Sequence, residues 1–269
     1  MGNQLMGKPY KAELNALEET YLWAKEIDIE PISRDISHNF FHPLISVGSG
    51  GSFSCAEMHS SLHKKFAGTA SSAITPMDLI YSFPRDGMAS IWFVSAGGNN
   101  IDIQRAFKHA SLLEPAGVSA LVGRENSKLR TIASKFSYTN FLEYPIPCGK
   151  DGFLATNSLL AFSILLVRSY HQVVRKSLQL PPTLKSFISR ALPKGMNVQK
   201  ISFAMSQIWQ CNTVHVVYSP FLKCVAVDIE SKFTEAGLGS VNISDLRNFA
   251  HGRHHWFSKQ SQDICERAC

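Results

Sequence analysis

The sequence predicts an α/β protein, a three-layer α-β-α sandwich built on a parallel sheet. Short apolar runs typical of buried strands alternate with helical patterns over residues 32–180. Two of these strands end in turns rich in glycine and serine, and the apolar residues 159–167 lie in a long helix of the buried type. The hydrophobic content of 45% and charged content of 18% are typical of a globular chain.

The elements of the first domain follow in order along the chain. Leucines and Tyr21 recur at helical spacing in residues 12–24, which predicts a leading helix with Pro31 in the connector after it. Strands are expected at residues 44–47, 73–75, 90–95, 118–122 and 140–144. Helices are expected at residues 53–66, 101–113, 127–136 and 155–176, with a turn or short helix from Pro76. Ligands of such sheets bind beyond the carboxyl ends of the strands, where both glycine turns lie.

A boundary is expected at Pro181-Pro182. Beyond it, residues 198–210 predict a helix, 214–218 a strand and 222–236 another helix, which repeats the opening of the first domain. The remaining tail is too short for the other strands of a second sheet. We therefore expect a leading helix in residues 1–31, a sheet domain in 32–180 and an incomplete second domain in 181–269, as in a truncated domain or a piece of a longer protein.

Composition excludes several classes of partner and location. The net charge is +6, but the basic residues are scattered, which disfavours nucleic acid and allows attraction of small anions. Six cysteines at irregular spacing favour reduced thiols in the cytoplasm. The N-terminus lacks the apolar core of a signal peptide, and the longest apolar run is too short to cross a membrane.

The first glycine turn is a candidate anion site. It follows the apolar run 44–47 and carries Gly48, Gly50, Gly51 and Ser52 into the start of a helix. The first N–H groups of a helix have no intrahelical partner, and the helix dipole places partial positive charge there. No Gly-Lys-Ser/Thr follows, so this is a phosphate cradle without a P-loop lysine. A tight turn that binds no ligand is an equal alternative.

Three motifs in this order resemble the sugar isomerase (SIS) domain family. They are the first glycine turn, the second turn Ser95-Ala-Gly-Gly-Asn-Asn-Ile-Asp102, and the helix start Ala155-Thr-Asn-Ser158. The sequence is similar to the isomerase domain of glucosamine-6-phosphate synthase, which has two such domains in tandem. The resemblance implies a flavodoxin-like SIS fold over residues 32–174, followed by the beginning of a second, incomplete SIS domain.

The resemblance also implies a phosphosugar site at the three motifs. In the second turn Gly97 stands where the family has a phosphate-binding serine, and Asn100 stands where it has a threonine. The glycine N–H and the asparagine amide are still able to donate hydrogen bonds. The residues expected to hold the phosphate are Ser52, Ser95, Gly97, Gly98, Asn100 and Thr156. Each of the three hydroxyls also suits a simple helix cap.

The second half holds the residues that the resemblance assigns to catalysis. Glu235 is followed sixteen residues later by His251-Gly252, the spacing of the family's glutamate and histidine. The resemblance makes Glu235 the proton shuttle between adjacent sugar carbons and His251 the ring opener. That histidine acts in the neighbouring subunit's site, which implies a homodimer. An ordinary surface carboxylate is the alternative for Glu235.

Metal sites are the weaker interpretation of the histidines. The cluster at residues 251–255 has no carboxylate or cysteine at ligand spacing, and His59 and His63 lack the glutamate of a His-Glu-x-x-His motif. We therefore expect no metal and no redox cofactor. The leading hypothesis is an aldose–ketose isomerase of a sugar phosphate or aminosugar phosphate. The alternatives are a non-catalytic sensor of a phosphosugar or nucleotide, and an interaction scaffold.

Overall fold

The computed structural model describes residues 9–82, 87–208, 211, 213–255 and 259, and the chain divides into two compact units, residues 1–185 and 186–269. The first unit is built on a five-stranded sheet with the order β2-β1-β3-β4-β5, in which every pairing is parallel. Its strands are β1 (Leu44–Val47), β2 (Ser71–Ile74), β3 (Ser90–Ser95), β4 (Gly117–Val122) and β5 (Thr139–Glu143). The predicted parallel sheet is confirmed.

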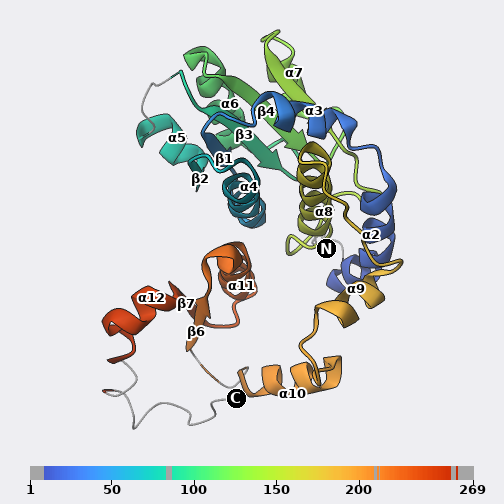
Figure 1. Ribbon diagram of the computed structural model, residues 1–269, viewed down its shortest axis with the longest axis vertical. Coiled ribbons are helices and arrows are strands. Elements are labelled where there is room, and N and C mark those ends of the chain that lie inside the picture. Colours follow the sequence, from blue (N-terminus) through green and yellow to red (C-terminus); the bar gives the residue numbers. More distant parts are fainter. Residues whose placement is uncertain (1–8, 83–86, 209–210, 212, 256–258, 260–269) are drawn as a thin grey trace, which may run out of the picture. The chain divides into compact units, whose positions relative to one another are not determined.

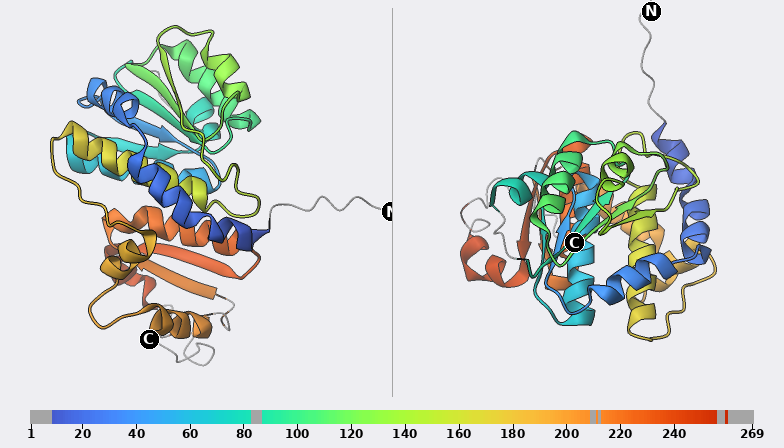
Figure 2. Two further views of the ribbon diagram at one scale, coloured as in Figure 1. Left: turned by 90° about the vertical axis from the view of Figure 1, so that its right-hand side faces the viewer. Right: turned by 90° about the horizontal axis from the view of Figure 1, so that it is seen from above.

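Helices cover both faces of this sheet (Figure 1). The left view of Figure 2 shows the same layers from the side. On one face α4 packs against α8, and α2 and α3 pack against α8, whereas α6 packs against α5 and α7 on the other. The bounds of these helices are α2 (Leu17–Glu26), α3 (Glu30–His38), α4 (Gly51–Ala67), α5 (Pro76–Ser82), α6 (Ile101–Leu113), α7 (Lys128–Ala133) and α8 (Asn157–Val173).

Strand β3 explains the three layers, because its side chains alternate between two separate apolar cores. Trp92 and Val94 belong to the core that includes α3, α4 and α8. Ile91 and Phe93 belong to the core that includes α5, α6 and α7. The strand is buried throughout, as expected for the centre of a sheet covered on both faces.

The leading segment differs from the prediction of one helix with Pro31 in a connector. It forms α1 (Tyr10–Asn15), α2 and α3, and Pro31 lies in the first turn of α3. A proline is tolerated there because the first N–H groups of a helix have no intrahelical acceptor. The expected strand 73–75 is also displaced, since β2 covers Ser71–Ile74. As an edge strand beside β1 alone, β2 carries polar residues that the apolar pattern did not indicate.

The second unit contains a two-stranded parallel sheet, β6 (Thr213–Tyr218) and β7 (Ser240–Asp245), joined by α11 (Lys223–Glu235). The remaining elements of this region are α9 (Leu184–Ala191), α10 (Val198–Ile208), the 3₁₀ turn η1 (Pro220–Leu222), α12 (Leu246–Asn248) and the irregular turn η2 (Phe249–Arg253). Helix α9 crosses the division between the units after Lys185.

Two expectations concern the whole chain. No helix in the described part is long and apolar enough to span a membrane. Four of the six cysteines, Cys55, Cys148, Cys211 and Cys224, form no disulfide within the described residues, and Cys265 and Cys269 lie outside them.

Candidate functional site

The candidate site lies where the strand connections of the first unit's sheet begin to run in the opposite direction across the sheet. From β1 the chain passes through α4 to β2 on one side, and from β3 it passes through α6 to β4 on the other. The turns that follow β1 and β3 therefore flank a topological switch point, since these two strands are neighbours. In open α/β sheets a ligand binds in the crevice at such a point. Both glycine turns of the sequence lie there.

The turn after β1 leaves backbone donors available. Ser52 N–H donates to Ser49 O at 3.2 Å and Phe53 N–H to Gly50 O at 2.8 Å, which closes the turn. The N–H groups of Gly50 and Gly51 have no acceptor in the described part of the chain, and the half-buried hydroxyl of Ser52 has none either. Two amides and one hydroxyl at a helix N-terminus are suited to an anion.

Gly51 is required by close packing. A Cβ atom at Gly51 would lie 2.1 Å from the Cβ of Ala155, the residue that leads into α8. The start of α4 therefore touches the approach to α8. Two of the three helix starts named by the sequence motifs are thus in direct contact.

The turn after β3 is partly closed on itself. The buried hydroxyl of Ser95 accepts a hydrogen bond from Gly98 N–H at 3.0 Å. The side-chain oxygen of Asn100 accepts from Asp102 N–H and Ile103 N–H, which makes Asn100 the N-cap of α6. Gly97 N–H, the Asn100 side-chain amide and the hydroxyl proton of Ser95 are donors for which the described residues offer no acceptor.

The start of α8 already holds an anion, the carboxylate of Asp151. This carboxylate accepts six hydrogen bonds, from the backbone N–H groups of Thr156, Asn157 and Ser158 and from their three side chains, at 2.7–3.1 Å. The Thr156 hydroxyl donates to Asp151 Oδ1 at 3.0 Å. The hydroxyl proton of Thr156 is therefore used within the protein and is not available to a ligand.

Asp151 is held in its charged form. Burial alone would raise the pKa of this carboxyl, but the hydrogen bonds from Ser158 and Asn157 outweigh burial and hold its pKa below the usual range. The loop that carries Asp151 is fixed in turn by Glu13 of α1. Its buried carboxylate accepts from Gly152 N–H and Phe153 N–H. The N-terminal helix thus supports the approach to α8.

Two residues of this edge escaped the sequence analysis, Asp151 and Arg124. Asp151 precedes the motif Ala155-Thr-Asn-Ser158 by only a few residues, but nothing in the pattern showed that it folds back onto the helix start. Arg124 follows β4, and its Cδ lies 3.9 Å from where a Cβ at Gly97 would be. It is exposed and forms no ion pair with the described residues. A basic residue directly after a buried strand was the available signal.

Glu235 and His251 lie at opposite edges of the two-stranded sheet of the second unit. Glu235 ends α11, which runs antiparallel to β6 and β7, so Glu235 is near the amino edge of the sheet. His251 lies in η2, beyond the carboxyl end of β7. Helix α11 has thirteen residues and spans about 20 Å. Both side chains are exposed, and Glu235 Oε1 accepts from the Ser231 hydroxyl at 2.7 Å.

Other histidines do not form a metal site in the described part of the chain, where no group of three potential ligands comes together. His59 and His63 instead face the core between α4, β3 and α8. The His63 ring bonds Tyr170 OH at 2.9 Å and the His42 carbonyl at 3.0 Å. His59 is 3.3 Å from the Ser46 hydroxyl and packs edge-on against Trp92.

Comparison with known proteins places this arrangement in a known fold. Neither a protein-family model nor a curated protein matches the sequence. The structure is similar to the C-terminal domain of glucosamine-fructose-6-phosphate aminotransferase from Francisella tularensis, with a TM-score of 0.67, 14% identity and coverage of 95% of this chain and 75% of that one. It is also similar to tagatose-6-phosphate ketose/aldose isomerase from Escherichia coli, with a TM-score of 0.64, 13% identity and coverage of 94% and 72%.

A third similar structure is glucosamine-6-phosphate deaminase from Thermotoga maritima, with a TM-score of 0.60, 14% identity and coverage of 88% of this chain and 72% of that one. These likenesses extend over most of each chain at low identity, so they concern the fold. The chain therefore has the SIS fold that its motifs predicted.

Proposed function

We propose that the protein binds a sugar phosphate at the switch point between β1 and β3. The observation that carries this proposal is the set of free donors at that edge: the N–H groups of Gly50, Gly51 and Gly97 and the Ser52 hydroxyl. These donors belong to the turns that follow the neighbouring strands β1 and β3, and Arg124 adds a cation beside Gly97. Phosphate oxygens accept several hydrogen bonds at once and suit the positive end of α4.

The proposed ligand contacts differ from those expected from sequence. Gly98 N–H donates to the Ser95 hydroxyl oxygen, which leaves the Ser95 hydroxyl proton available, whereas Thr156 donates its hydroxyl proton to Asp151. We therefore assign the phosphate to the α4 turn, the Ser95 hydroxyl, Gly97 and the Asn100 amide, with Gly98 and Thr156 shaping the edge. The names of the similar structures, which include an isomerase and a deaminase of hexose or aminohexose 6-phosphates, support a sugar phosphate as the ligand.

We propose further that the reaction is aldose–ketose isomerisation, with Glu235 as the proton shuttle and His251 as the ring opener. Isomerisation moves one proton between C2 and C1 of the open-chain sugar, with a proton transferred between the C1 and C2 oxygens, so atoms balance without an oxidant or metal. A carboxylate suits the carbon proton, and an imidazole suits the oxygen protons that open the ring. No redox or metal cofactor is part of this proposal.

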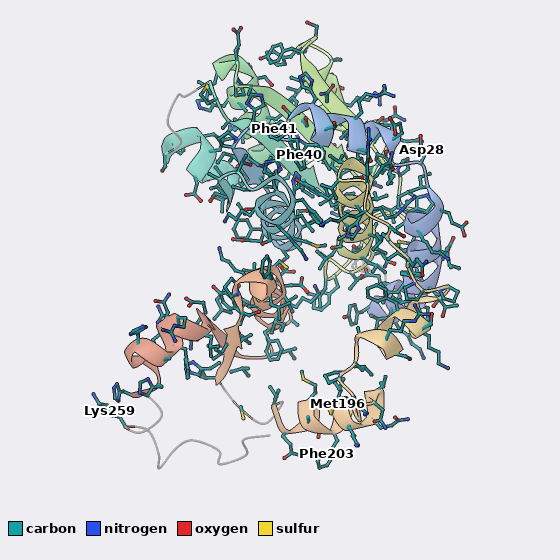
Figure 3. The ribbon with its side chains drawn as sticks, in the orientation of Figure 1. Asp28, Phe40, Phe41, Met196, Phe203 and Lys259 are labelled. Atoms are coloured by element: carbon teal, nitrogen blue, oxygen red, sulfur yellow. The ribbon has the colours of Figure 1, made fainter. Side chains whose placement is uncertain are left out.

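The topology of the second unit supports a homodimer as the active form. Glu235 and His251 lie at opposite edges of one two-stranded sheet, so a single copy of that unit does not bring them together. A second copy would supply the missing partner. Helix α10 offers apolar surface for association, since none of its residues is buried and Phe203 is 71% exposed. Figure 3 shows Phe203 on α10, with Met196 just before the helix.

The test is exchange of the C2 proton of glucose 6-phosphate and galactose 6-phosphate in deuterated water, followed by ¹H NMR. Glu235→Gln keeps the size and hydrogen bonding of the side chain but removes the base, so exchange should fall by at least about 10²–10⁴ while binding survives. Glu230→Gln on the same helix is the matched control and should retain exchange. Exchange that persists in Glu235→Gln would remove Glu235 from the mechanism.

A phosphosugar sensor without catalysis is the second candidate. Two observations favour it: the internal carboxylate of Asp151 closes the start of α8, and Glu235 is exposed within its own unit rather than desolvated. Sugar phosphate binding without C2 exchange in the parent protein would select the sensor. Absence of both binding and exchange would overturn both proposals.

A further inference from the structure

A cavity of the first unit, of about 630 Å³, has no place in the proposed reaction. It lies where α2 ends and α3 begins, against the last turns of α8 and the segment that follows α8. The start of α8 belongs to the candidate edge, and the seventeen residues of this helix span about 25 Å. The cavity is therefore at the far end of α8, and its volume is in the range of small-molecule sites.

The lining of this cavity is basic. Lys25, Arg168, His171 and Lys176 contribute to it, and no aspartate or glutamate does. Neither Lys25 nor Lys176 has an ion pair or a side-chain hydrogen bond within the described residues. Two acids act close to this lining. Glu30 accepts from Gln172 at 2.7 Å and pairs with Arg34, whereas Asp28 accepts from Glu30 N–H at 2.9 Å and adds a favourable charge to Arg168.

Arg168 and His171 both line the cavity. Arg168 Nη1 donates to the carbonyls of Ala24 and Ile27 at 2.8 Å each, which neutralises the negative end of α2 and fixes the guanidinium in place. His171 Nδ1 is buried and has no hydrogen-bond partner in the part of the chain that the structure describes. Phe66 packs edge-on against the His171 ring, with centroids 5.2 Å apart. A buried ring nitrogen without a partner is costly unless a ligand or water completes it.

We propose that this cavity binds a phosphorylated small molecule, with its phosphate held among Lys25, Arg168, His171 and Lys176. The lining also contains the apolar side chains of Ile29, Leu178 and Leu180, which suit the carbon skeleton of such a ligand. Lys25 and Lys176 provide positive charge that is not already used within the protein, as that of Arg168 is at the end of α2, and the His171 ring lines the same cavity. Because residues 178–180 lead from α8 to α9, the ligand also fastens this connection to α8. This site does not depend on the proposed isomerase reaction.

The experiment follows the ¹H–¹⁵N signals of the histidine rings at fixed pH during titration with inorganic phosphate and with phenyl phosphate. His171 is assigned from the spectrum of His171→Gln. We expect its ring signals to shift with saturation, and phenyl phosphate to bind more tightly than phosphate because of the apolar side chains in the lining. The double variant K25Q/K176Q should weaken binding roughly two- to thirty-fold, the range for two partly exposed charge contacts.

Matched controls separate this site from the candidate edge. The double variant K64Q/K108Q removes the same charge from exposed lysines outside the cavity, and it should leave the His171 titration unchanged. Ser52→Ala should also leave it unchanged, because Ser52 lies at the other end of α8. Unshifted His171 signals at saturating phosphate and phenyl phosphate would overturn the proposal. Equal binding by K25Q/K176Q and the parent protein would overturn it as well.

Discussion

Replacement of Asp151 tests the internal anion at the start of α8. In Asp151→Asn the new amide nitrogen cannot accept a hydrogen bond, so three of the six donors at this carboxylate lose their acceptor. The negative charge at the helix N-terminus is lost too. Loss of a cap costs about 1–2 kcal/mol and loss of the charge about 1 kcal/mol more, so the free energy of unfolding should fall by about 2–3 kcal/mol.

Urea denaturation at neutral pH measures this difference. The variant should still fold, since typical domains are stable by about 5–15 kcal/mol. The matched control is Asp102→Asn in the first turn of α6, where the side chain is exposed and makes no hydrogen bond in the described structure. The control should change the free energy of unfolding by about 0.5 kcal/mol. Equal values for the two variants would refute the role of Asp151 as the bound anion of α8.

The pH dependence of the same variant supplies an independent check. The folded pKa of Asp151 is below its unfolded value, so its contribution is present above the ordinary value of 3.8 and is lost as the pH falls through the folded pKa. Asp151→Asn should therefore differ from the parent protein at neutral pH and converge toward it in acid. A difference that stays constant down to the lowest measurable pH would contradict the assignment of a charged carboxylate.

Three further predictions concern the packing around α4. Burial lowers the pKa of His59 and His63 below the ordinary value of 6.5, so the unfolded chain binds more protons than the folded protein. The free energy of unfolding in urea should therefore decrease as the pH falls below 6.5, and a flat profile there would contradict this. Tyr170→Phe leaves the Nδ1 of His63 without its donor and should cost about 1–3 kcal/mol in urea denaturation, whereas a cost near zero would show that the bond does not form. Gly51→Ala should cost about 1–3 kcal/mol because its Cβ would collide with Ala155, and a neutral result would mean that α4 and α8 are not in contact at this point.

The sequence predicted those parts of the fold that depend on local pattern. The strands expected at residues 44–47 and 90–95 have the same bounds in the structure, because a short and mainly apolar run between turn residues has few alternatives to a buried strand. The prediction of a single leading helix was wrong because the break between α1 and α2 and the position of Pro31 within α3 depend on tertiary packing. Helices α2 and α3 both pack against α8. Local periodicity does not report such contacts.

In the candidate site too, the sequence predicted the features that depend on local pattern and missed those that depend on tertiary contacts. The glycine turns were visible in sequence, because a strand that ends in glycines before a helix is a local signal. The hydrogen bonds from Gly98 N–H to Ser95 and from the Thr156 hydroxyl to Asp151 could not be predicted. Hydroxyls that cap a helix and hydroxyls that bind a ligand belong to the same residue types. The opposite positions of Glu235 and His251 required the strand topology of the second unit.

The central claim, that the glycine turns bind the phosphate of a sugar, can be measured at the glycine amides themselves. Selective ¹⁵N-glycine labelling gives amide signals from the seventeen glycines. The labelled protein is titrated with glucose 6-phosphate and, separately, with glucose. We predict that glucose 6-phosphate shifts the amides of Gly50, Gly51 and Gly97, that Gly68 and Gly149 stay in place, and that glucose shifts none of them. Calorimetric binding of glucose 6-phosphate without any shift at Gly50, Gly51 and Gly97 would contradict the account.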